Sequence, residues 1–197
     1  MSDTTEPQRE RIWDPLVRLV HWCLVISVLA GYFMGENMSF SNIGWHFWAG
    51  YATGALLLVR ILWGFVGTKP ARFSDFIARP GKTLAYAKTA TKRSPSYWPG
   101  HNPMGAWSAV AIWVVLAGMV VTGLFSESDD FFTSAPLAGY IPSDMRLTMN
   151  SWHHTLHLFV LPLILLHLCA IAFYYFWKRE NLVKPMITGW KWVRRKG

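Results

Sequence analysis

The chain has 197 residues, of which 52% are hydrophobic and only 15% are charged, and its formal net charge is +8. A water-soluble domain of this length usually carries more charge, so the composition argues against one. The apolar residues gather in four runs of about twenty residues, each long enough to cross a hydrocarbon core of roughly 30 Å as a helix. These runs are Leu16–Met34, Trp45–Val66, Ala106–Phe125 and Thr155–Trp177. Because backbone in lipid must satisfy its own hydrogen bonds, we expect an all-α fold, an integral membrane four-helix bundle.

The segments outside these runs are polar. Residues 1–15 mix acidic and basic side chains, which is not typical of a signal peptide, so the first run should stay in the membrane. The transmembrane domain should cover residues 16–177, with helices at about 16–34, 45–66, 106–125 and 155–177. Residues 178–197 should form a basic cytoplasmic tail.

Positive charge occupies alternate connections. Lysine and arginine precede the first run, fill the segment between the second and third, and follow the fourth. The two opposite loops are net acidic, with Glu36, Glu127, Asp129, Asp130 and Asp144 against Arg146. This is the positive-inside pattern, so both termini should be cytoplasmic. The basic balance then reflects topology and contact with anionic lipid, and we expect no nucleic-acid partner.

Histidines recur at two expected depths. His21 lies a few residues into the first run, toward the cytoplasm, and His46 opens the second run near the outer face. His153 opens the fourth helix, also near the outer face, and His167 lies fourteen residues further in. Fourteen residues return a helix to within roughly 40° of its starting direction. We therefore expect His46 to face His153 and His21 to face His167, and two imidazoles on either side of a flat macrocycle are the ligands of a bis-histidine haem.

Alternatives to this histidine assignment stay open. His154 points about 140° away from His167 on an ideal helix, but Pro162 can bend the helix, so His153 is favoured over His154 without excluding it. His157 is a candidate pocket or hydrogen-bonding residue. All could instead be ordinary core or interfacial histidines. A zinc or nickel site would gather its ligands at one depth, whereas these divide between two.

Two glycines and two arginines fit a bulky anionic cofactor. Gly50 and Gly54 follow His46 by one and two turns and clear one side of the helix, although such spacing also serves ordinary helix packing. Arg18 and Arg60 lie within the predicted spans, where no Asp or Glu is available. A buried arginine normally has an acidic partner. We assign both to haem propionates, the alternative being that they snorkel to lipid phosphates.

Several stretches, in order, resemble the bacterial di-haem cytochrome b561 family and the b-type cytochrome subunits of Ni,Fe-hydrogenases. They are WDPLVRLVHW (Trp13–Trp22), Gly44–Phe76, GHNPMGAW (Gly100–Trp107) and RENLVKPMITG (Arg179–Gly189). The resemblance implies a four-helix bundle that holds two non-covalent b haems. Carried over by position, it implies His21, His46, His153 and His167 as the haem iron ligands, and no ligand role for His101.

The resemblance also implies a multi-pass protein of the bacterial cytoplasmic (inner) membrane. It would exchange electrons between quinone or quinol and a redox partner, either a cytochrome c or a hydrogenase-type subunit. Iron with two histidine ligands has no free position, so single-electron transfer is expected rather than oxygen binding. The acidic loop Ser126–Trp152 is a candidate docking surface or simply a solvated connector.

Two other functions stay open. Some relatives of this kind are superoxide:quinone oxidoreductases, so the chain could itself be an enzyme. That reaction needs a cationic funnel over the outer haem, whereas the outer loops are net acidic. The other alternative is a haem-free, histidine-lined metal or proton transporter, which would be colourless when purified.

Overall fold

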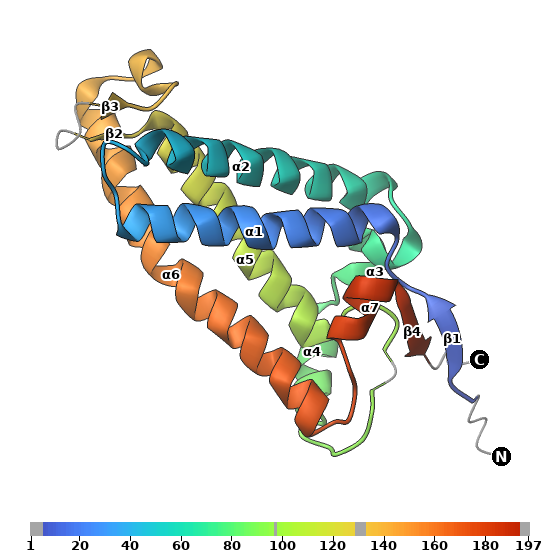
Figure 1. The fold of residues 1–197 in the computed structure, drawn as a ribbon. Coiled ribbons are helices and arrows are strands. Elements are labelled where there is room, and N and C mark those ends of the chain that lie inside the picture. The colour runs from blue at the N-terminus through green and yellow to red at the C-terminus, as the bar shows by residue number, and fades with distance from the viewer. Residues whose placement is uncertain (1–5, 97, 129–132, 194–197) are drawn as a thin grey trace. The chain divides into compact units, whose positions relative to one another are not determined.

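Four long helices dominate the structure, a computed structural model that describes residues 6–96, 98–128 and 133–193. They are α1 (Pro15–Glu36), α2 (Ile43–Val66), α5 (Pro103–Phe125) and α6 (Ser143–Phe176) (Figure 1). Each of the four is long and apolar enough to cross a membrane. The predicted all-α membrane helical bundle is confirmed.

The helix boundaries differ from the prediction chiefly in α6. This helix begins at Ser143, well before the predicted start at 155. The apolar run marks the part that lipid would surround, but the helix continues through the polar sequence SDMRLTMNSW ahead of it. His153 therefore lies inside α6 and does not open it. Pro162 is accommodated within the same helix.

Short elements, which the apolar runs do not predict, occupy the connections. The short helices are α3 (Phe73–Phe76), α4 (Pro80–Ala87), α7 (Val183–Thr188) and the 3₁₀ helices η1 (Lys69–Ala71) and η2 (Ala138–Tyr140). Strand β1 (Gln8–Arg11) pairs antiparallel with β4 (Trp190–Val193), and β2 (Glu127–Ser128) pairs antiparallel with β3 (Thr133–Ser134).

The chain divides into two compact units, and each long helix contributes residues to both. Unit 1 comprises Met1–Leu19, Arg60–Val110 and Leu165–Gly197. Unit 2 comprises Val20–Val59 and Ala111–Ile164.

Unit 1 has a small apolar core where the N-terminal and C-terminal segments meet. Its buried members are Ile12, Trp13, Val17, Ala71 and Val193. The core joins Trp13, two residues before α1, and Val17 in the first turns of α1 to Val193, the last residue of β4, so the β1–β4 pair packs against the start of the first long helix.

Asp14 is the N-cap of α1. Its Oδ1 accepts the backbone N–H of Val17 at 2.9 Å, and Pro15 occupies the first helical position, which suits proline. Its Oδ2 accepts hydrogen bonds from Trp63 Nε1 at 2.9 Å and Thr68 Oγ1 at 2.8 Å. Burial raises the pKa of Asp14, but these hydrogen bonds outweigh burial and leave the pKa below its ordinary value.

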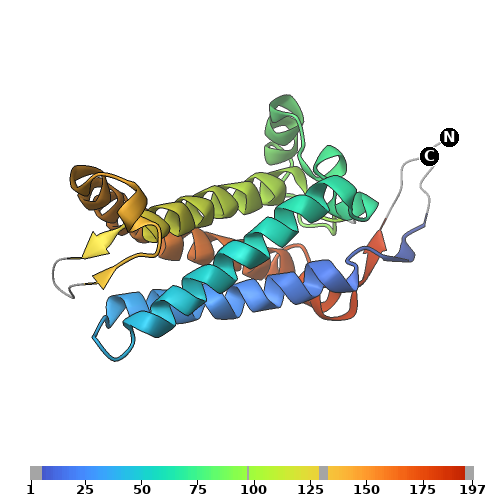
Figure 2. The same ribbon diagram turned by 90° about the horizontal axis from the view of Figure 1, so that it is seen from above.

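Unit 2 is built on close helix contacts. Over this unit α1 and α2 lie side by side in both views (Figures 1 and 2), and Thr53 Oγ1 on α2 donates to Ser27 Oγ on α1 at 3.1 Å. A Cβ on Gly54 would lie 2.9 Å from Val120 of α5, and one on Gly118 would lie 2.8 Å from Leu156 of α6. Gly54 therefore serves helix packing, the more ordinary of the two roles considered for it.

Candidate haem site

Two histidines from different helices face each other in unit 2. The ring centroids of His46 on α2 and His153 on α6 are 6.2 Å apart, with an interplanar angle of 80°. A metal between two imidazoles lies about 2 Å from each nitrogen, and each nitrogen is about 1 Å from its ring centre, which requires centroids about 6 Å apart. The spacing of His46 and His153 therefore suits one metal atom held between them.

Both rings are oriented by backbone carbonyl oxygens of neighbouring helices. Nδ1 of His46 lies 3.0 Å from the Gly31 carbonyl oxygen on α1, and Nδ1 of His153 lies 3.0 Å from the Met119 carbonyl oxygen on α5. A carbonyl oxygen can only accept, so each Nδ1 carries the hydrogen and donates it. Each Nε2 then keeps a lone pair. Histidines that bind metals are usually held in this way by their second nitrogen.

A cavity of about 340 Å³ opens between these histidines and the surrounding helices. Gly31, Gly35, Gly50 and Gly123 all line it. A Cβ on Gly50 would meet nothing within 4 Å, so this glycine leaves open space. A Cβ on Gly123 would lie 3.0 Å from Cε1 of His153, so the absence of a side chain there lets the His153 ring reach its carbonyl partner.

These features fit a flat macrocycle with a central metal. The cavity offers two imidazole nitrogens with free lone pairs, and haem needs only two axial ligands because the porphyrin supplies the other four. Among the described residues, no three His, Cys, Asp or Glu side chains gather around a common point for a metal ion.

His154 and His157, which also belong to α6, line the cavity as well. His154 is exposed on the surface of the helices. The ring of His157 stacks on Tyr32 with centroids 4.6 Å apart, and its Nε2 lies 3.0 Å from Oε1 of Glu36. Nε2 has no hydrogen-bond partner among the described residues, and its contact with Glu36 is an ion pair only when the imidazole is protonated. The ring of His153 lies beside the His46 ring and has a carbonyl partner, which favours His153 over His154 as a ligand.

The other predicted ligands do not lie in one unit. His21 belongs to unit 2, where its ring lies edge-on to Trp22 with centroids 5.3 Å apart. His167 is half-buried in unit 1. Their pairing stays a prediction.

Both predicted propionate partners lie in unit 1 and have protein contacts. Arg60 is buried, and its two terminal nitrogens each lie 3.4 Å from the Ala71 carbonyl oxygen. The charge of Asp14 also acts on Arg60. Asp14 lies one residue before α1, outside the predicted spans, so the sequence did not indicate it as an acidic partner of Arg60. Arg18 donates from Nη1 to the Ile187 carbonyl oxygen, while its buried Nε has no hydrogen-bond partner among the described residues.

Sequence reasoning found the histidines but not the groups that orient them. Every residue has a carbonyl, so nothing in the sequence singles out those of Gly31 and Met119. Gly123 is a weak sequence signal for a position that makes room for a ligand ring, since it is a glycine near the end of a long apolar helix that has no histidine of its own.

An apolar helical bundle in which two histidines line one cavity has the features of a class, the membrane-bound b-type cytochromes. The sequence matches the family described as prokaryotic cytochrome b561 over residues 12–189, and the chain belongs to this family. It is a membrane electron-transfer cytochrome, and the family implies b-type haem. The resemblance stated from the sequence is confirmed.

Curated relatives cover most of the chain at low identity. A protein of Azotobacter vinelandii named "Probable Ni/Fe-hydrogenase B-type cytochrome subunit" is 26% identical over 211 residues, which span 91% of this chain and 87% of the relative. The "Probable Ni/Fe-hydrogenase 1 B-type cytochrome subunit" of Escherichia coli K12 is 25% identical over 217 residues, spanning 91% and 89%. No solved structure matches the chain significantly.

Proposed function

We propose that this protein carries electrons across a bacterial cytoplasmic membrane, between the quinone pool and a redox partner, through two b haems. His46 and His153 would hold the outer haem, and His21 and His167 the inner one. The observation that carries the proposal is the pair of hydrogen bonds from Nδ1 of His46 and His153 to backbone carbonyl oxygens. These bonds leave both Nε2 atoms available as ligands in one cavity.

The chain's residues would prepare the haem site and not take part in bond-making. The carbonyl oxygens of Gly31 and Met119 orient the two imidazoles, and Gly50 leaves space beside them. Bound haem iron supplies the one-electron chemistry, and two histidine ligands leave no position for oxygen. In a membrane, the apolar helices around the cavity would limit the access of water.

The side chain of Arg18 would favour an anionic group, such as a haem propionate, beside the proposed inner haem. Its buried Nε has no hydrogen-bond partner among the described residues, and a guanidinium N–H suits a carboxylate oxygen. A haem propionate would satisfy it. Arg60 already interacts with Asp14 and Ala71, so a propionate there would be an additional partner.

The names of the relatives favour a hydrogenase-type subunit as the redox partner, with a cytochrome c as the second candidate. The positive-inside pattern would place both termini in the cytoplasm and the acidic connector, residues 126–152, at the outer face. That connector would form the docking surface. Its residues 129–132, with Asp129 and Asp130, lie outside the described residues.

Haem stoichiometry tests the proposal. Purified protein should be red and contain two haems per chain in a pyridine haemochrome assay, and a quinol should reduce them. His46→Ala and His153→Ala should each lose one haem, whereas His101→Gln should keep both. Colourless protein with bound zinc or nickel, or two haems retained in both ligand variants, would contradict the proposed site.

Mild detergent extraction tests the partner. A hydrogenase-type subunit or a cytochrome c should co-purify with the red protein, and electrons from that partner should reach an added quinone. Reduction of haem by quinol without any transfer to either kind of partner would refute this assignment while leaving the haem sites intact.

A further inference from the structure

The β1–β4 ribbon of unit 1 carries its side chains in an unusual arrangement. Side chains alternate between the two faces of a strand. In β4, Trp190 and Trp192 lie on one face and are 43% and 58% exposed, whereas Lys191 and Val193 lie on the other and are buried. An ordinary surface strand buries its apolar face and exposes its charged face. Here two tryptophans point outward and a lysine points inward.

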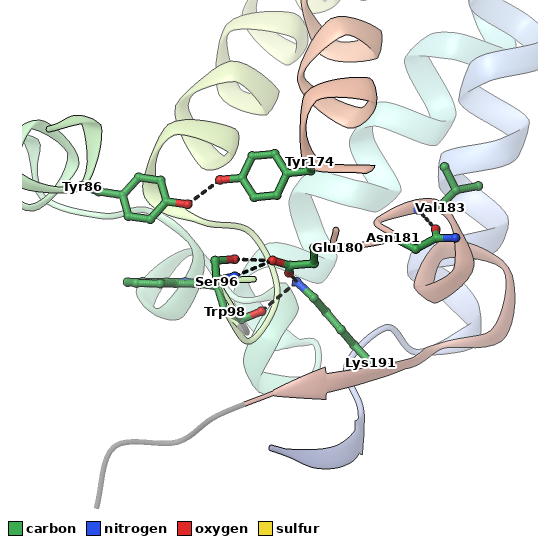
Figure 3. A network of polar contacts seen from close by, with 8 residues as sticks. All are labelled: Tyr86, Ser96, Trp98, Tyr174, Glu180, Asn181, Val183 and Lys191. Atoms are coloured by element: carbon green, nitrogen blue, oxygen red, sulfur yellow. Dashed lines mark hydrogen bonds and ion pairs between the residues drawn. The ribbon is translucent and has the colours of Figure 1, made fainter. Parts of the chain in front are cut away.

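The inward position of Lys191 is specifically stabilised. Its ammonium forms an ion pair with Oε1 of Glu180 at 2.8 Å and donates to the Trp98 carbonyl oxygen at 2.9 Å (Figure 3). Oε2 of Glu180 accepts hydrogen bonds from the backbone N–H and the hydroxyl of Ser96, both at 2.7 Å (Figure 3). Shifting β4 by one residue would bury the tryptophans and break this network. The exposure of both tryptophans is therefore fixed by the register.

The exposed face of the ribbon is also basic. Arg9 pairs with Trp192 and Arg11 with Trp190 across the strands, and cross-strand partners share a face. The guanidinium carbon of Arg9 lies 5.2 Å from the centre of the Trp190 ring. The acidic residue of β1, Glu10, pairs with Lys191 and so lies on the inward face. We call Arg9, Arg11, Trp190 and Trp192 the Trp–Arg face.

We propose that the Trp–Arg face rests on anionic phospholipid headgroups of the membrane that the helices span. Tryptophan is favoured at the boundary between lipid and water because its ring is apolar and its N–H is polar. Basic side chains beside it attract anionic lipid. Arg11 is four residues before the start of α1, which limits the ribbon to about 14 Å from the end of that helix.

Photocrosslinking tests this contact in the full-length, haem-loaded protein. Benzoylphenylalanine replaces Trp192, and the protein is reconstituted either in phosphatidylethanolamine with about one third phosphatidylglycerol or in phosphatidylcholine alone. Light should attach phosphatidylglycerol to the peptide that contains residue 192. The same probe at Leu166, an exposed position of a spanning helix, should give lipid adducts in both membranes and verifies the photochemistry.

Charge variants test whether the phosphatidylglycerol adduct depends on the two arginines of the Trp–Arg face or on positive charge anywhere on the protein. Arg9→Gln/Arg11→Gln should reduce the phosphatidylglycerol adduct by about fivefold for each arginine, and high salt should reduce it similarly. Lys88→Gln/Lys92→Gln removes the same charge from exposed positions off the ribbon and should leave the adduct unchanged. Haem content confirms that each variant is folded. Absence of lipid adducts at residue 192, capture of a protein instead, or equal adducts in both membranes would overturn the proposal.

Discussion

Gly123→Ala should weaken haem binding through a single contact with His153. The added Cβ would lie 3.0 Å from Cε1 and 3.2 Å from Nδ1 of the ring. Neighbouring atoms normally keep a larger separation, so the ring must move and strain its 3.0 Å hydrogen bond to the Met119 carbonyl oxygen. Losing such an orienting partner typically costs about 10- to 100-fold in metal affinity. Because the bond is strained and not removed, we expect roughly a tenfold loss, about 1.4 kcal/mol.

The assay compares haem content and haem release between two alanine variants. Gly44→Ala is the control, since Gly44 lies in α2, does not line the cavity and has nothing within 4 Å of its added Cβ. Alanine is a better helix former than glycine, so neither change should weaken its helix. Gly123→Ala should release one of its haems faster to apomyoglobin. Release no faster than from Gly44→Ala would refute the proposed role of the His153 orientation.

Three other sets of substitutions test separate parts of the molecule. His153→Ala should lose one haem while His154→Ala keeps both, and the reverse haem counts would shift the ligand by one residue. Asp14→Asn should lower the free energy of unfolding by about 1 kcal/mol, because Asn still caps the helix but its amide nitrogen cannot accept the hydrogen bond from Trp63 Nε1. Since the folded pKa of Asp14 is depressed, its contribution is present above its ordinary pKa and is lost as pH falls through the folded value. Thermal melts of wild type and variant should therefore converge in acid, and a constant gap would contradict this. Glu180→Gln should cost about 3–5 kcal/mol by leaving Lys191 charged and buried, and Glu180→Gln/Lys191→Met should recover most of it. Equal unfolding midpoints for the single and double variants would argue against that ion pair.

The spanning helices were predictable because lipid permits few alternatives. A long apolar run in a membrane must form a helix, so composition alone located α1, α2 and α5 closely. The same criterion failed at the start of α6, because lipid constrains only the apolar part of a helix and says nothing about its polar extension from Ser143.

The terminal ribbon could not be predicted for a different reason. QRER and WKWV lie at opposite ends of the chain, and neither is long enough to indicate a strand by itself. Their pairing depends on the core around Trp13 and Val193 and on the ion pair between Lys191 and Glu180. Read by hydrophobicity alone, WKWV would bury its tryptophans, which is the opposite of the observed faces.

The candidate site divides into a part that sequence encodes and a part that only packing creates. Helical periodicity and depth were enough to expect His46 opposite His153. Their orientation depends on carbonyl oxygens of two other helices, and no side-chain substitution removes a backbone carbonyl. What substitution can change is how closely the His153 ring approaches its partner, which Gly123 permits by having no side chain. Gly123, on a helix without a predicted ligand, should therefore limit the geometry of the His153 ring, so Gly123→Ala should weaken haem binding while His153→Ala should abolish it at that site.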